Sequence, residues 1–220
     1  MENSNTENFT VSGGNFQIQK QYGELIIRKK KKTLDNSAFV LSDEDIKKLL
    51  DACKRLQDRV MLELMVYEGL RRDEVVNLSA RDVDFEHCVL HLKKTKGLRE
   101  REIPLLPDVQ KNLKYLFEGR REGYLLTNPR GLKMSTRNVN GLLSEIGKRA
   151  GITHPANPER VIHPHLLRHT FSRRFLKNGG RMEVLQKLLG HGSITTTIGV
   201  YGSPSMDSIR EDFLKTVKTV

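Results

Sequence analysis

From residue 41 onward the apolar residues recur at helical spacing, and only one stretch changes to the alternation that is typical of strands. The first helix is expected to begin behind Ser42, a favourable N-cap, and to carry Ile46, Leu49, Cys53 and Leu56 on one face. Further helices are expected at residues 60–69, 72–78, 108–118, 135–150, 165–178, 181–190 and 206–217.

The alternating stretch covers residues 83–105, with a polar turn at Thr95-Lys96-Gly97 near its middle. This pattern predicts a small antiparallel sheet that contains a β-hairpin with a basic tip. Asp108 and Ser135 are expected to cap two of the helices that follow. The sequence therefore predicts a mainly α-helical domain of the α+β class, with one small antiparallel β-sheet.

Residues 1–38 differ from the rest of the chain. Asn, Ser, Thr and Gly dominate the start, residues 16–27 alternate as an edge strand or a hairpin would, and a basic run, Arg28 to Lys32, follows. That run is either a solvated linker or an arm that lies along phosphates. We expect a polar and basic arm over residues 1–38 and one folded domain with a C-terminal helix over residues 39–220.

The charge balance favours a polyanionic partner, because 38 Lys and Arg face 27 Asp and Glu, a net charge of +11. No apolar run approaches the ~20 residues that a transmembrane helix needs, and the first residues lack the pattern of a secretory signal. Cys53 and Cys88 lie in apolar-patterned segments, as small core residues of a reducing compartment do. We expect a cytoplasmic protein without a membrane partner.

Residues suited to phosphodiester chemistry gather between residues 163 and 201. The guanidinium of Arg168 can bind two phosphate oxygens at once, and the imidazoles of His165 and His191 exchange protons near neutral pH. Tyr201 offers a phenol that can attack phosphorus. Earlier in the chain, Arg71 offers a second guanidinium. Lys96, at the expected hairpin tip, offers an acid for a leaving oxygen.

A metal site is the competing interpretation of the histidines. His165 and His169 have the i, i+4 spacing of metalloprotease ligands, but Leu166 stands where the catalytic Glu of that motif belongs. Arg168 between the two histidines would repel a cation. The sequence therefore argues against a metal.

Taken together, these motifs resemble those of the tyrosine recombinases, or phage-type integrases, over their catalytic domain, from about Leu41 to Tyr201. Four boxes occur in the order of that family: Gly69-Leu70-Arg71 with Glu74 and Asn77-Leu78, Lys94-Thr95-Lys96-Gly97 leading to Arg101–Leu105, His165-Leu166-Leu167-Arg168-His169, and Leu189-Gly190-His191. The resemblance implies the integrase catalytic-domain fold over residues 39–220.

The resemblance also implies roles for the residues. Tyr201 would attack the scissile phosphate of double-stranded DNA and form a 3′-phosphotyrosyl link, with Arg71 and Arg168 on the non-bridging oxygens. Lys96 would protonate the leaving oxygen. His165 would assist proton transfer from the phenol, and His191 would donate a hydrogen bond to the phosphate. No metal or nucleotide cofactor is implied, and family members assemble on DNA as a synaptic tetramer through the segment after the tyrosine.

Two departures from the family pattern stand out. Tyr201 follows His191 by ten residues where the family usually has nine, with Gly199 in the interval. Longer members carry a separate core-binding domain, whereas fewer than forty residues precede the catalytic domain here. Both a minimal member, similar to the short inversion-type recombinases, and a fragment of a longer protein fit this pattern.

Two alternatives to a site-specific recombinase stay open. A type IB topoisomerase shares the fold and most of the chemistry but rejoins the same strand, and the complete Leu-Gly-His box favours the recombinase over it. A catalytically silent DNA-binding protein, regulatory or architectural, is the alternative from another class. The complete set of six residues argues against a silent protein, while the spacing of Tyr201 and the short N-terminus leave room for it.

Overall fold

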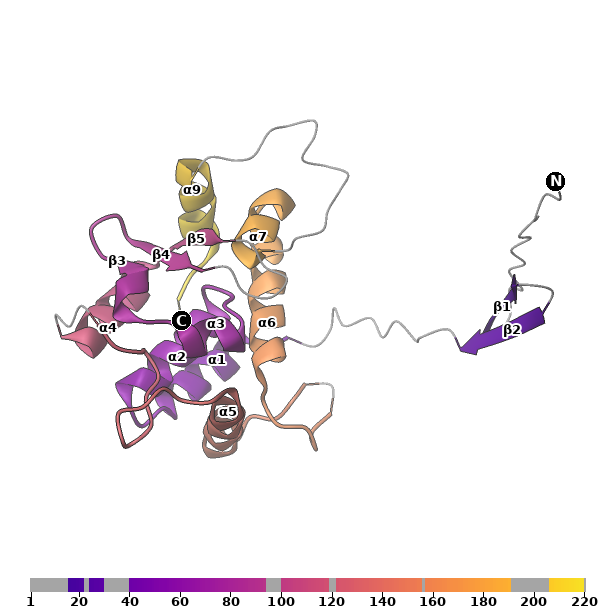
Figure 1. The fold of residues 1–220 in the computed structure, drawn as a ribbon, viewed down its shortest axis with the longest axis horizontal. Coiled ribbons are helices and arrows are strands. Elements are labelled where there is room, and N and C mark those ends of the chain that lie inside the picture. The colour runs from indigo at the N-terminus through magenta and orange to yellow at the C-terminus, as the bar shows by residue number, and fades with distance from the viewer. Residues whose placement is uncertain are drawn as a thin grey trace. The chain divides into compact units, whose positions relative to one another are not determined.

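The computed structural model describes residues 16–21, 24–29, 40–93, 100–118, 122–155, 157–190 and 206–219 (Figure 1). Its contacts divide the chain into two units, Met1–Ala38 and Phe39–Val220. In the first unit, β1 (Phe16–Gln21) pairs antiparallel with β2 (Glu24–Lys29), so the alternating stretch forms a hairpin. Lys30 to Lys32 of the basic run lie outside the described residues.

The larger unit begins with α1 (Asp43–Asp51) and α2 (Leu56–Val66). The expected N-cap is confirmed: the Ser42 hydroxyl accepts from the Asp45 backbone N–H at 3.1 Å, and the Asp45 carboxylate accepts from the Ser42 backbone N–H at 3.0 Å. The expectation of one helix that reaches Leu56 was wrong. The Ala52 N–H closes α1 by donating to Lys48, and Leu56 begins α2 after an extended residue, Arg55.

The remaining elements of the larger unit follow the expected order. They are α3 (Arg72–Asn77), a 3₁₀ turn (Ala80–Asp82), β3 (Val83–Asp84), β4 (Val89–Leu92), β5 (Arg101–Pro104), α4 (Pro107–Phe117), α5 (Thr136–Ala150), α6 (Pro164–Lys177), α7 (Met182–Leu189) and α9 (Met206–Thr216). The three strands form an antiparallel sheet in the order β3-β4-β5. A mainly helical α+β fold with one small sheet in this unit is confirmed.

Of the two predicted helix caps Ser135 and Asp108, only Ser135 is confirmed. Ser135 caps α5, because its hydroxyl accepts from the Asn138 N–H at 3.2 Å. Asp108 is not a cap: α4 begins one residue earlier, at Pro107, whose fixed φ suits the first helical position and whose missing N–H costs nothing there. The Asp108 carboxylate instead accepts from the Thr219 hydroxyl at 2.9 Å.

Helix α2 is the centre of the core. Every residue from Val60 to Val66 is buried, as in a helix that is surrounded by other elements. It packs against α6 and α4, while α5 covers α1 and α7 lies beside α6 (Figure 1). Helices α3 and α6 both contact this central helix. None of the helices among the described residues has the length and apolarity to span a membrane.

Helix α9 packs on its own chain. Ile209 and Phe213 are buried, and the helix lies against β5 and α7. Polar side chains of α9 also bind other parts of the unit: Arg210 donates to the His87 carbonyl, and the Asp212 carboxylate pairs with Arg181. The apolar stripe that the sequence predicts is therefore helical and intramolecular in this structure.

Glu68 is a buried acid in this core. It has no exposed surface, its Oε1 accepts from the Leu106 N–H at 3.0 Å, and its Oε2 has no hydrogen-bond partner among the described residues. Burial raises the pKa of Glu68 to about 8, which the hydrogen bond from Leu106 opposes and the nearby Glu63 carboxylate reinforces. The side chain is therefore protonated in the folded protein at neutral pH.

We expect this proton to make the stability depend on pH. Because the folded pKa lies above the ordinary 4.5, the unfolded chain ionises first, and stability is lost as the pH rises from about 4.5 to about 8. The loss amounts to a few kcal/mol at most. Glu68→Gln keeps the acceptor for Leu106 and does not titrate. Urea unfolding should therefore show the variant gaining on the wild type between pH 5 and 8.

The matched control is Glu145→Gln, at an exposed position of α5. That variant should follow the wild-type pH profile. Identical profiles for Glu68→Gln and the wild type would contradict the burial of a protonated carboxyl.

Candidate active site

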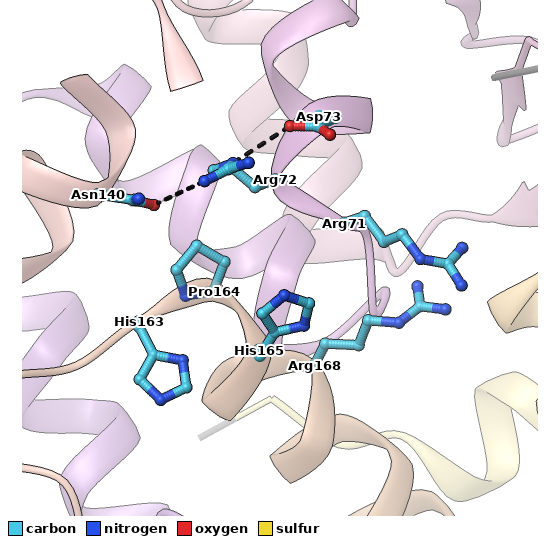
Figure 2. Close-up of a pocket in the computed structure, with 8 residues that line it drawn as sticks. All are labelled: Arg71, Arg72, Asp73, Asn140, His163, Pro164, His165 and Arg168. Carbon is cyan, nitrogen blue, oxygen red and sulfur yellow. Dashed lines mark hydrogen bonds and ion pairs between the residues drawn. The ribbon is translucent and has the colours of Figure 1, made fainter. Parts of the chain in front are cut away.

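A cavity of about 240 Å³ lies where α3, α5 and the start of α6 meet (Figure 2). Its lining is rich in basic and polar side chains: Arg71, Arg72, Asp73, Asn140, His163, Pro164, His165 and Arg168. Three of the six predicted site residues, Arg71, His165 and Arg168, are thus brought together. Lys96, His191 and Tyr201 lie outside the described residues.

The start of α6 places His165 and Arg168 in this cavity. Pro164 occupies the first helical position, and the His163 ring nitrogen Nδ1 accepts from the Leu166 N–H at 3.3 Å as the N-cap. Residues three apart lie on one helical face, so both side chains reach the same cavity. His165 is exposed there, whereas only 8% of Arg168 is exposed.

Arg168 is held by main-chain oxygens. One terminal nitrogen, Nη1, donates to the Gly69 carbonyl, and the other, Nη2, donates to the Leu189 carbonyl at 2.7 Å. Burial lowers the pKa of Arg168 to about 9, and the neighbouring Arg71 lowers it further, while Glu74 opposes the change. The guanidinium remains charged at neutral pH, and a bound anion would favour its charged form.

Arg71 meets Arg168 at the same acceptor. Its Nη1 donates to the Leu189 carbonyl at 3.0 Å, so one oxygen receives both guanidiniums. The backbone N–H of Arg71 donates to Glu74 Oε2 at 2.7 Å, which fixes the residue at the N-cap of α3. Figure 2 shows the two guanidinium groups adjacent and pointing to the same side. We call Arg71, Arg168 and the Leu189 carbonyl the arginine clamp.

Gly69 is required for this geometry. Its φ of +67° is a left-handed conformation that side chains rarely adopt. A Cβ atom at this position would lie 2.4 Å from Cδ1 of Phe171, on α6. The glycine therefore lets the chain that leads to Arg71 approach α6 closely enough for its carbonyl to accept from Arg168.

The other end of the cavity is lined by residues that the sequence analysis did not select. Arg72 donates to Asn140 and to Asp73, at 3.5 and 3.2 Å (Figure 2). The His163 ring stacks on His154, with ring centroids 5.3 Å apart. Burial, and then the neighbouring histidines and an arginine, lower the pKa of His163. This keeps the ring neutral, as its acceptor role requires.

Arg101, the first residue of β5, is the most important residue that was not selected. Arg101 occurs in the family box that follows Lys94-Thr95-Lys96-Gly97, but no role was predicted for it. Its guanidinium binds both carboxylate oxygens of Glu74, at 2.7 and 3.0 Å. The family box marked this segment, but no side-chain pattern in it indicated that Arg101 would bind Glu74.

A doubly cationic pocket of this kind suits an anion with several oxygens. Guanidinium groups bind phosphate in a fork, and the histidine beside them can move a proton. Among the residues that the structure describes, no three His, Cys, Asp or Glu side chains gather as metal ligands would. Two fixed guanidiniums on one cavity thus suit an anion such as a phosphate group.

Comparison with known proteins places the fold in a family. The model of the phage integrase family matches residues 40–207. The chain belongs to this family. The tyrosine recombinase XerA of Saccharolobus solfataricus is 32% identical over 179 residues, which are 81% of this chain and 57% of the relative.

Solved structures share the fold. A crystal structure of XerA recombinase matches with a TM-score of 0.62 and 27% identity, over 78% of this chain and 62% of that one. The Tn1549 transposon integrase, in complex with transposon right end DNA, matches with a TM-score of 0.60 and 22% identity, over 79% and 64%. This phage integrase family chain spans about three fifths of the length of these proteins.

Proposed function

We propose that this chain is a tyrosine site-specific recombinase that cleaves and rejoins double-stranded DNA in the cytoplasm. The observation that carries the proposal is the arginine clamp beside His165, because two fixed guanidiniums on one cavity match the charge of a phosphodiester in its transition state. Family membership and the net charge of +11 support the same substrate.

In the proposed reaction the Tyr201 phenol oxygen attacks the scissile phosphorus. A bond from that oxygen to phosphorus forms, and the bond from phosphorus to the 5′-oxygen breaks. His165 takes up the phenol proton, and Lys96 donates a proton to the leaving 5′-oxygen. Rejoining follows when a 5′-hydroxyl of the partner strand attacks the 3′-phosphotyrosyl link and releases the tyrosine.

The cations act on the phosphate itself. Arg71 and Arg168 bind the non-bridging oxygens, and His191 adds a hydrogen bond. Because both guanidiniums are anchored on the Leu189 carbonyl before DNA arrives, they need little reorganisation as charge develops. We include no metal or nucleotide cofactor, because the covalent phosphotyrosyl link stores the bond energy for rejoining.

Strand exchange between two duplexes needs several protomers, and we propose a synaptic tetramer on DNA. The basic arm over residues 1–38 would lie along the DNA backbone and strengthen binding. Helix α9, which packs on its own chain here, is the segment that we propose links neighbouring protomers.

The first prediction concerns the nucleophile. Tyr201→Phe should keep DNA binding and lose all covalent product, because the ring no longer carries an attacking oxygen. The substrate is a nicked duplex that carries the site selected by the protein from a random-sequence library. The nick lets the cleaved strand diffuse away, so the covalent complex accumulates and is measured on a denaturing gel.

The matched control is Tyr124→Phe, at an exposed tyrosine of the same unit. It should form as much covalent complex as the wild type. A denaturation-resistant complex with Tyr201→Phe would assign the chemistry to another nucleophile, and a wild-type protein that binds but never cleaves would make it a silent DNA-binding protein.

The second prediction concerns the clamp. Arg168→Lys should lower the single-turnover cleavage rate by about 10²–10³-fold, because one ammonium group cannot hold two carbonyls and a phosphate with the geometry of the fork. Arg173→Lys, the same change on the same helix but away from the clamp, serves as the control. Equal cleavage by Arg168→Lys and the control would count against phosphate binding at this position.

The third prediction concerns assembly. Native mass spectrometry of the wild type with its site should give four protomers on two duplexes. Deletion of residues 204–220, which removes the buried Ile209 and Phe213, should abolish the tetrameric complex and the recombinant product. A truncated chain that keeps the wild-type circular dichroism spectrum should still bind a single site, and an insoluble one would assign α9 to its own domain alone. Lys215→Ala, at an exposed position of α9, is the control. Normal recombination by the truncated chain would refute the role of α9.

A further inference from the structure

Arg101 begins β5, where it pairs with Leu92 at the end of β4, and the sequence between these two residues contains Lys96. Only 8% of its side chain is exposed. Its guanidinium makes three hydrogen bonds: Nη1 and Nη2 donate to the two oxygens of Glu74 at 2.7 and 3.0 Å, and Nε donates to the Leu188 carbonyl at 2.7 Å. One side chain thus joins three separate elements, β5, α3 and α7.

Each of these contacts adjoins the arginine clamp. The Glu74 oxygen that accepts from Arg101 Nη2 also accepts the backbone N–H of Arg71, at 2.7 Å. Leu188 immediately precedes Leu189, whose carbonyl accepts from both clamp arginines. A displacement of Arg101 would therefore move the backbone of Arg71 and the shared acceptor together.

The backbone of Gly190 approaches the Arg101 guanidinium closely. Its φ is +64°, and a Cβ atom there would lie 2.8 Å from Arg101 Nη1 and 2.9 Å from Cδ. Glycine is thus required where α7 ends, one residue before His191. The end of α7 is seated on Arg101 by both a hydrogen bond and a close backbone approach.

Arg101 lies outside the cavity that Arg71 and Arg168 line. Both of its terminal nitrogens donate to the Glu74 carboxylate, and the Glu74 side chain is only 2% exposed. Any influence on the reaction must therefore pass through the residues that it holds.

We propose that Arg101 is a positioning residue that aligns Arg71, at the start of α3, and the Leu189 carbonyl, at the end of α7, around one phosphate. The proposal rests on the proposed function and adds to it the residue that sets the alignment. Its planar fork is essential, because a lysine cannot bind both oxygens of Glu74 and the Leu188 carbonyl with fixed geometry.

The test compares Arg101→Lys and Arg101→Met with the wild type in single-turnover cleavage of the nicked duplex and in DNA affinity. Both variants should bind DNA as the wild type does, while cleavage falls by about 10²-fold, the loss that a misplacement of about 1 Å produces. Arg81→Met, at an exposed arginine of the neighbouring 3₁₀ turn, is the control and should cleave normally. Wild-type cleavage by both variants would overturn the proposal.

A parallel loss of affinity and cleavage would also overturn it, because Arg101 would then be a phosphate contact. Arg101→Met leaves a buried carboxylate without its partner and risks unfolding. The double variant with Glu74→Gln removes both charges, and Arg101→Lys retains the charge. Circular dichroism identifies which of them fold as the wild type does, and those variants carry the test.

Hydrogen exchange gives a readout that does not depend on catalysis. In Arg101→Lys the amides of the last turn of α7 and of β5 should exchange faster, while those of α5 stay as in the wild type. Unchanged exchange at α7 would overturn the positioning role even in a protein that cleaves no DNA. A silent wild type with the expected exchange pattern would instead refute the proposed function alone.

Discussion

The carbonyl oxygen of Leu189 is the contact on which the site depends. It accepts Nη1 of Arg71 at 3.0 Å and Nη2 of Arg168 at 2.7 Å, and so it holds two like charges side by side. These residues are 118 and 21 positions away from Leu189 in the chain. Closing the site therefore requires α3, α6 and the end of α7 to be packed correctly at the same time.

Burying several positive charges close together costs free energy, and nearby negative charge offsets only part of that cost. Arg71 and Arg101 both pair with one buried carboxylate, Glu74, whose charge also favours the charged form of Arg168. Burial lowers the pKa of both clamp arginines, which means that their charged forms are less favoured in the free protein than in water. In the function that we propose, a phosphate between them would offset that cost, so the arrangement would favour an anionic ligand.

The core supplies the rigidity that this arrangement needs. From Val60 to Val66 helix α2 is buried on every side, and the chain leaves it through Gly69, whose positive φ and close approach to Phe171 set the distance between α3 and α6. The buried Glu68 beside this glycine shows that the junction retains a polar group at some cost to stability at high pH. The end of α7 is seated in the same way by Gly190 against Arg101.

The sequence by itself determined the family, the helical pattern of the larger unit with its small sheet, and the two arginines of the clamp, because capping residues, apolar periodicity and side-chain chemistry are local signals. It misplaced the start of α4 at Asp108 and ran the first helix on to Leu56, where local signals compete. Only the tertiary structure decided the partners of the arginines. Apart from the Glu74 carboxylate, their acceptors are main-chain carbonyls of Gly69, Leu188 and Leu189, and a carbonyl is the same in every residue. No side-chain pattern can announce such a contact, so Arg101 became visible only when folding brought β5 against Glu74 and the end of α7.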